Sequence, residues 1–163
     1  VKEPPITIAI DPSIERSLGY PSEGRIRMAN PGFDGATVET YWKPTLIHEM
    51  MHLTQNYIST AHQWITEGIA EYGRVKLGFT SPNYPVSCAY EPYKRYTVNG
   101  GYLCANALFR YIEKQYDSQF VDKLHDAEGN GTYSDAFFID RTGKDVETLY
   151  AECLSFECAG GNP

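Results

Sequence analysis

The chain has 163 residues, enough for one domain with a sizeable hydrophobic core but too few for two domains of usual size. Its formal net charge of -7 at pH 7 argues against binding to nucleic acids or to anionic membrane surfaces. No apolar run approaches the roughly 20 residues that a membrane-spanning helix needs. We therefore expect a soluble, monomeric protein whose single domain covers residues 1–163.

Two segments near the N-terminus have the alternating pattern of β-strands. Residues 6–10 are rich in β-branched side chains. Residues 24–29 alternate between arginines and the apolar Ile26 and Met28, so that one side of the strand is apolar. These segments predict a small N-terminal sheet.

The rest of the chain is predicted to be mostly helical, which gives an α+β fold class. A first helix begins near Pro44 and runs to about residue 58, because proline is favoured in the first turn. A second helix covers residues 65–77 and ends at Gly78. A long loop over residues 80–101 follows, and further helices are predicted at residues 102–116, 120–124, 135–139 and 146–156.

The first predicted helix contains the pattern HExxH, formed by residues 48–52. Positions four apart lie on one face of a helix, so His48 and His52 can bind the same metal ion while Glu49 lies beside it. The alternative is two histidines on a half-buried helix face without a metal. The pattern favours a zinc ion, Zn2+, as the cofactor.

The second predicted helix supplies a candidate third ligand, Glu67, with fourteen residues between it and His52. Two histidines and one carboxylate leave a fourth zinc position open for water, as hydrolysis requires. Two helices joined by a short turn can pack against each other, and the small residues Gly68 and Ala70 permit a close approach. The alternative is that Glu67 is a solvated surface charge.

Glu71 lies one turn after Glu67 on the same helix face. Its carboxylate can accept the second ring N–H of a ligand histidine and so fix the orientation of that ring. The alternative is a surface carboxylate paired with Arg74.

This ligand set predicts peptide-bond hydrolysis by a zinc-activated water, with Glu49 as the general base. The oxyanion that forms needs a further hydrogen-bond donor beside the metal. Among the tyrosines, Tyr102 at the start of the third helix is the first candidate, Tyr133 the second and Tyr96 the third. The remaining histidines, His62 and His125, are further candidates.

The strand that precedes the metal-binding helix is a candidate substrate-binding element. An exposed edge there can bind an extended peptide by strand addition. We assign this role to Arg27, Met28 and Ala29. The alternative is an ordinary sheet edge.

Four cysteines, Cys88, Cys104, Cys153 and Cys158, lack the CxxC spacing of a thiolate zinc site. An even count is typical of two disulfides in an oxidising compartment, with three possible pairings. Four buried thiols are the alternative. The cysteines thus favour an extracellular location.

Four features together resemble the basic secretory protein family of plants and bacteria. They are HEMMHLTQ, WITEGIAEYGR, the Gly-Tyr start of the third helix, and the tail TYSDAFFIDRTGKDVETLY, over about residues 44–150. The resemblance implies a zincin-like metallopeptidase with an active-site helix followed by a glutamate helix, and a secreted protein that acts on peptides or proteins. The element WxxEGxAEY is similar to the glutamate helix of gluzincins, which implies the ligand role for Glu67. The acidic composition departs from the family name, and the four cysteines have no counterpart in the family pattern.

Two other readings remain open. Gly131 to Asp135 is faintly similar to the motif of aspzincins, which makes Asp135 an alternative third ligand, and His62 is another. The spacing of metzincins does not fit, because Ile58 and Gln55 occupy the positions of their histidine and glycine. A secreted zinc-containing defence or binding module without catalysis is the remaining alternative, but such a module has no need of Glu49.

Overall fold

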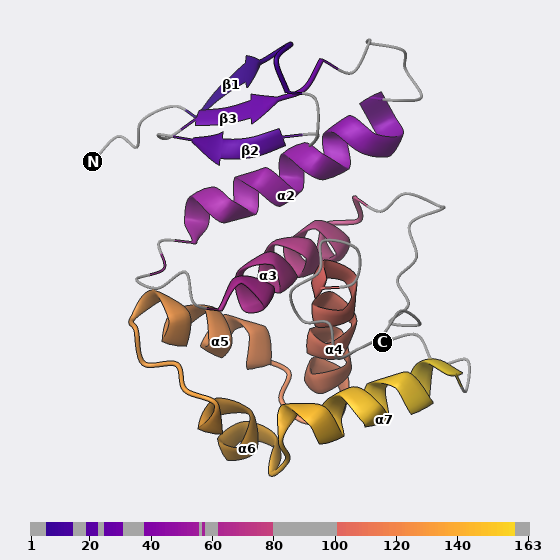
Figure 1. Ribbon diagram of the computed structural model, residues 1–163. Coiled ribbons are helices and arrows are strands. Elements are labelled where there is room, and N and C mark those ends of the chain that lie inside the picture. Colours follow the sequence, from indigo (N-terminus) through magenta and orange to yellow (C-terminus); the bar gives the residue numbers. More distant parts are fainter. Residues whose placement is uncertain are drawn as a thin grey trace. The chain divides into compact units, whose positions relative to one another are not determined.

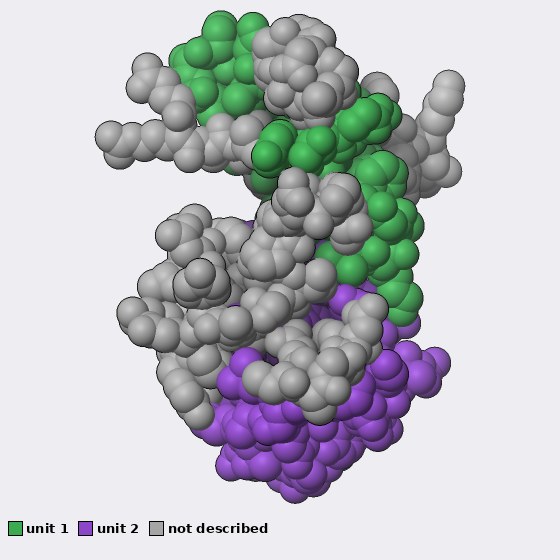
Figure 2. Space-filling model, turned by 90° about the vertical axis from the view of Figure 1, so that its right-hand side faces the viewer, with its two compact units in different colours: residues 1–54, 73–84 green, residues 55–72, 85–163 purple. Residues whose placement is uncertain are grey.

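A computed structural model describes residues 6–14, 19–22, 25–30, 38–55, 57, 62–79 and 101–158, and it combines helices with a small sheet (Figure 1). The α+β fold class is therefore confirmed. The chain divides into two compact units, formed by residues 1–54 with 73–84 and by residues 55–72 with 85–163 (Figure 2). Because each unit is built from two separate stretches, neither is a continuous domain, and the single domain over residues 1–163 stays a prediction.

Unit 1 contains a three-stranded sheet of β1 (Thr7–Ile10), β2 (Gly19–Ser22) and β3 (Arg25–Met28). The strand order is β1-β3-β2, with β3 parallel to β1 and antiparallel to β2. Ile26 and Met28 are completely buried, whereas the two arginines of β3 are exposed. The alternation predicted for this strand is thus confirmed.

The prediction that β3 offers a free edge is wrong. Arg27 pairs with Ala9 on one side and with Tyr20 on the other. Met28 likewise has a partner on each side, and its carbonyl also accepts a hydrogen bond of 2.8 Å from the Asp11 backbone N–H. A strand with a neighbour on both sides has no unpaired backbone row for an added peptide. The substrate-binding role predicted for Arg27, Met28 and Ala29 depended on this free edge and is therefore not supported.

A π-helical segment η1 (Val38–Trp42) leads into α2 (Lys43–Thr54), which lies against β2 and β3 in unit 1 (Figure 1). Pro44 occupies the first turn of α2, as predicted, and the helical residues of η1 directly precede this turn. The helix ends at Thr54, four residues before the predicted end. Tyr57, an apolar position of the predicted longer helix, lies beyond this end.

The helix α3 (Gln63–Lys76) matches the second predicted helix to within two residues. It ends where Gly78 adopts a positive φ of 80°. The N–H of Gly78 binds the carbonyl of Val75, and the N–H of Phe79 binds that of Arg74, at 3.0 and 3.1 Å. These two bonds form a Schellman motif, in which glycine accepts the left-handed conformation without a Cβ clash.

Unit 2 contains the N-terminal part of α3 and four further helices, α4 (Gly101–Gln115), α5 (Phe120–Gly129), α6 (Ala136–Thr142) and α7 (Val146–Cys158). The predicted C-terminal helices all occur, and α5 is longer than expected. Of the loop predicted over residues 80–101, residues 80–100 lie outside the described residues, and Gly101 is the first residue of α4. Within the described part of the chain, no helix is long and apolar enough to cross a bilayer.

The core of unit 2 is aromatic. Trp64 of α3 packs against Phe109 of α4 and Phe138 of α6, with ring centroids 5.9 Å apart in both pairs. Phe120 of α5 lies 5.3 Å from Phe138 and 6.2 Å from Phe109. Burial of such rings is a large favourable contribution to folding, so this cluster joins four helices into one core.

Gly68 is a position where α3 tolerates no side chain. A Cβ built there lies 2.4 Å from the Cβ of Ala105 and 2.7 Å from the ring of Phe109. We expect Gly68→Ala to destabilise the protein by about 1–2 kcal/mol, because overpacking outweighs the gain in helix propensity. Urea unfolding monitored by circular dichroism measures this change.

Gly129, the last residue of α5, provides the matched control. A Cβ built at Gly129 has no neighbour within 4 Å. Gly129→Ala should leave stability unchanged or raise it by up to about 1 kcal/mol. Equal stability of the two variants would contradict the close contact at Gly68.

The described cysteines do not form a disulfide. Cys104 on α4 and Cys153 on α7 are both buried and are not cross-linked. Cys88 and the side chain of Cys158 lie outside the described residues. The prediction of two disulfides is therefore not supported by the residues that the structure describes.

Candidate metal centre

The pattern HExxH lies in the interior of α2, as predicted. His48 and His52 are one helical turn apart and both are half-buried. Their Nε2 atoms are 3.1 Å apart, and the two rings meet edge to face. The sequence spacing alone accounts for this pair, because residues i and i+4 lie on one face of a helix.

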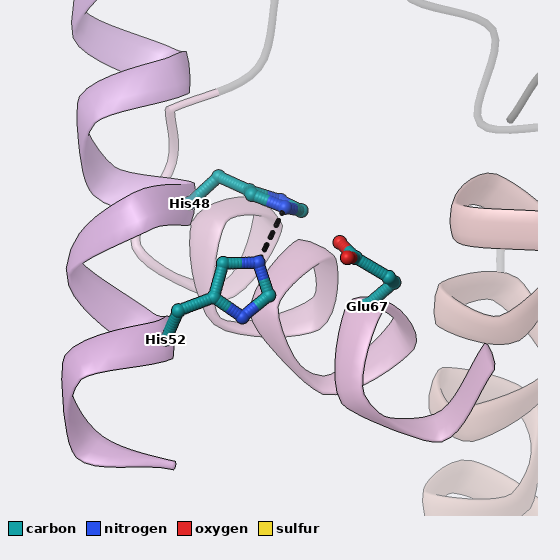
Figure 3. A group of neighbouring side chains, drawn as sticks. All are labelled: His48, His52 and Glu67. Atoms are coloured by element: carbon teal, nitrogen blue, oxygen red, sulfur yellow. Dashed lines mark hydrogen bonds between the residues drawn. The ribbon is translucent and has the colours of Figure 1, made fainter. Parts of the chain in front are cut away.

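Glu67 of α3 completes a group of three potential metal ligands. One ring nitrogen of each histidine and one carboxylate oxygen of Glu67 all lie within 4.8 Å of one another (Figure 3). Within the described ranges, this is the single group of three histidine, cysteine or acidic residues with such spacing. The predicted ligands are therefore brought together, and they can hold a metal ion.

The geometry of the two histidines fits a shared divalent metal. Two nitrogens that bind one zinc ion at about 2.0–2.1 Å with tetrahedral angles are about 3.3–3.4 Å apart. The observed 3.1 Å between the His48 and His52 Nε2 atoms is close to that separation. Two imidazoles and one carboxylate are also a donor set that catalytic zinc sites use, with one position left open. The residues present thus fit the metal predicted from the sequence.

Glu49 follows the first histidine directly and is rotated by about 100° around the axis of α2. Its side chain is buried, with 8% relative exposure. It is not a member of the group formed by His48, His52 and Glu67. A carboxylate that flanks the ligands without joining them is suited to proton transfer.

The glycine that brings α2 and α3 close together is not the one predicted. Gly68 contacts Ala105 and Phe109 of α4. In unit 1 it is Gly73 of α3 that faces α2, since a Cβ built there lies 2.7 Å from the terminal methyl of Met51. The sequence shows both glycines, but it does not indicate which neighbour each of them meets.

Glu71 is not a surface residue. It is 2% exposed, and Arg74 is 3% exposed. The Arg74 guanidinium donates a hydrogen bond to the Phe79 carbonyl. The surface location considered as the alternative for Glu71 is therefore wrong. The role of Glu71 in orienting a ligand histidine stays a prediction. A buried carboxylate needs polar partners, because burying an unpaired charge is costly.

Of the three tyrosines predicted as oxyanion donors, only Tyr133 has a side chain among the described residues. Tyr133 lies between α5 and α6, where its ring packs against His62 and Phe137 at centroid distances of 4.6 and 6.0 Å. The backbone of Tyr102 belongs to the first turn of α4, but its side chain lies outside the described residues, as does Tyr96. Tyr133 therefore has a packing role in unit 2, and the donor role of each tyrosine stays a prediction.

The remaining histidines contact α5. His62 Nδ1 lies 3.0 Å from a carboxylate oxygen of the buried Glu128, and burial raises the pKa of this glutamate despite the nearby His62. His125 Nδ1 lies 2.8 Å from the Tyr57 hydroxyl. Neither histidine belongs to the metal-binding group, and neither does Asp135, which precedes α6 at the surface. The described geometry therefore favours Glu67 as the third ligand.

Comparison with known proteins gives one match. No curated protein and no solved structure matches the chain. The family of peptidases of plants and bacteria, abbreviated BSP, matches residues 27–153, which is most of the chain and includes all three candidate ligands. This agrees with the resemblance found from the sequence motifs. The chain therefore belongs to the BSP family of plant and bacterial peptidases.

Proposed function

We propose that this protein is a zinc-dependent peptidase with a zincin-like fold, in which His48, His52 and Glu67 hold the metal. The observation that carries the proposal is the convergence of two imidazoles and one carboxylate to within 4.8 Å, in a chain of a peptidase family. The substrate class is peptides or proteins. An extracellular site of action is part of this proposal and rests on the family resemblance.

Zinc and the protein side chains have separate roles in the proposed reaction. When bound, zinc supplies a Lewis acid that polarises the scissile carbonyl and lowers the pKa of water. Glu49 accepts a proton from the attacking water and later delivers it to the leaving amine. Its burial restricts competing contacts with bulk solvent, which strengthens its electrostatic interactions at the site.

Two supporting roles complete the proposal. Glu71, one turn from Glu67, orients a ligand histidine by accepting its second ring N–H. Tyr102 donates a hydrogen bond to the developing oxyanion, with Tyr133 as the second candidate.

Removal and return of the metal test this function directly. We expect the protein to hydrolyse a denatured protein mixture, to lose this activity with a chelator, and to regain it when zinc is added in excess, because three protein ligands without metal supply no Lewis acid. Release of new amino termini measures the reaction. Zinc binding without any hydrolysis would instead identify a non-catalytic zinc-containing module.

A further inference from the structure

Gln55 connects the end of the HExxH helix to the residue that precedes Glu67. It follows α2 directly, three residues after His52. Its side-chain Nε2 donates a hydrogen bond of 2.8 Å to the backbone carbonyl of Thr66. Both residues are half-buried, so solvent competes only in part for this bond.

This hydrogen bond restricts the position of α3 at its metal-binding turn. Inside a helix, the Thr66 carbonyl faces the N–H four residues later, and its second lone pair remains available to the Gln55 amide. Three residues of extended chain span at most about 10–11 Å. The bond therefore ties the Thr66 carbonyl, directly before Glu67, to a side chain only three residues after His52.

The Gln55 amide is itself held by neighbouring groups of unit 2. It hydrogen-bonds the hydroxyl of Tyr57, which lies 2.8 Å from His125 Nδ1 on α5. Burial raises the pKa of Tyr57 above its ordinary value, while the hydrogen bond from Gln55 acts in the opposite direction. The hydroxyl thus stays protonated at neutral pH. His125, Tyr57 and Gln55 form a chain of contacts that ends at the Thr66 carbonyl.

We propose that Gln55 is a positioning residue for the metal ligand Glu67. This inference rests on the proposed metal site. Ligand atoms must lie within about 0.2 Å of their ideal metal distances, so a small rotation of α3 at Thr66 weakens binding. Partners that orient metal ligands typically contribute 10–100-fold to metal affinity.

Substitutions of Gln55 test this role through zinc affinity, measured with the full chain by competition with a chromophoric chelator. Gln55→Glu keeps the shape of the side chain but cannot donate to a carbonyl when ionised, and Gln55→Leu removes the donor without adding charge. We expect both to weaken zinc binding by about 10–100-fold. Gln63→Glu is the matched control, because Gln63 is exposed at the start of α3, and it should bind zinc within about twofold of the unchanged protein.

Thermal unfolding of the zinc-free proteins distinguishes positioning from general stability. A positioning role predicts that zinc affinity falls in the Gln55 variants even where the zinc-free protein keeps its melting temperature. Variants that unfold more easily but bind zinc as tightly as the unchanged protein would overturn the inference. Failure of the unchanged protein to bind zinc would instead overturn the proposed metal site.

A double variant adds an independent measurement. Tyr57→Phe removes the hydroxyl that orients Gln55, so it should weaken zinc binding less than Gln55→Leu does. Because both residues act through one chain of contacts, the loss in the double variant should be smaller than the product of the two single losses. Independent, multiplicative losses would contradict the chain from His125 to Thr66.

Discussion

Replacement of Glu49 by glutamine is expected to reduce peptide hydrolysis by about 10²–10⁴-fold while zinc binding stays within about twofold. Glutamine has nearly the same size, but its amide cannot accept a proton from water at neutral pH. Glu49 is not a member of the group of three candidate ligands, so the atoms proposed to bind the metal are unchanged. Initial rates at saturating zinc, together with the measured zinc content of the variant, give both quantities.

The control for this substitution is Glu39, which precedes His48, the first residue of the HExxH pattern, by nine positions. Glu39 in η1 is 66% exposed in its side chain and pairs with Lys43 at 2.5 Å. Exposed pairs of this kind contribute little to stability. Glu39→Gln should therefore leave both activity and zinc binding intact. Normal hydrolysis by a zinc-loaded Glu49→Gln protein would exclude Glu49 as the general base without affecting the ligand assignment.

Replacement of Glu67 by glutamine is expected to weaken zinc binding by more than the 10–100-fold typical of residues that orient a ligand, because it removes a proposed direct ligand. The amide oxygen carries no net charge, so it is a poorer ligand for a divalent cation than a carboxylate. Activity at limiting zinc should fall in parallel and recover in part at high zinc. Isothermal titration with zinc measures the affinity of the variant.

Asp135→Asn replaces a carboxylate by an amide, as Glu67→Gln does, and so tests the other candidate third ligand. Asp135 lies at the surface before α6, outside the group formed by His48, His52 and Glu67. We therefore expect this variant to bind zinc like the unchanged protein. Loss of zinc in Asp135→Asn, with normal binding by Glu67→Gln, would reverse the assignment and favour the aspzincin alternative.

The two pairs of variants also separate the possible functions. If Glu67→Gln loses zinc and Glu49→Gln keeps zinc but loses hydrolysis, the metal and the proton transfer are both assigned. If the unchanged protein binds zinc through Glu67 and no substrate mixture is cleaved, a binding or defence module is the better description. The BSP family membership favours the first outcome.

Several features could be predicted from the sequence because they depend on neighbours along the chain. The HExxH spacing predicts that His48 and His52 share a helix face, and their Nε2 atoms are 3.1 Å apart. Gly78 marks the end of α3 because a left-handed residue must follow the last turn. The alternation of β3 likewise identifies its buried side from residue type alone.

Other features depend on contacts between distant residues and could not be predicted. The sequence favours an edge position for β3, but parallel pairing with β1 and antiparallel pairing with β2 enclose this strand. Gly68 and Gly73 have the same residue type and lie on the same helix. One contacts Ala105 of α4 and the other Met51 of α2. A small residue indicates that something approaches closely, but the sequence does not indicate which element approaches.

The sequence by itself determined the helical placement of the two histidines, the position of Glu49 beside the first of them, and the peptidase family. Only the tertiary structure decided that Glu67, and not Asp135 or His62, joins the histidine pair, and that Gln55 reaches the carbonyl before it. The physical reason is the separation along the sequence over which each effect acts. Helix periodicity fixes neighbours within about one turn, whereas the meeting of side chains fifteen or more residues apart depends on how the core packs the helices that carry them.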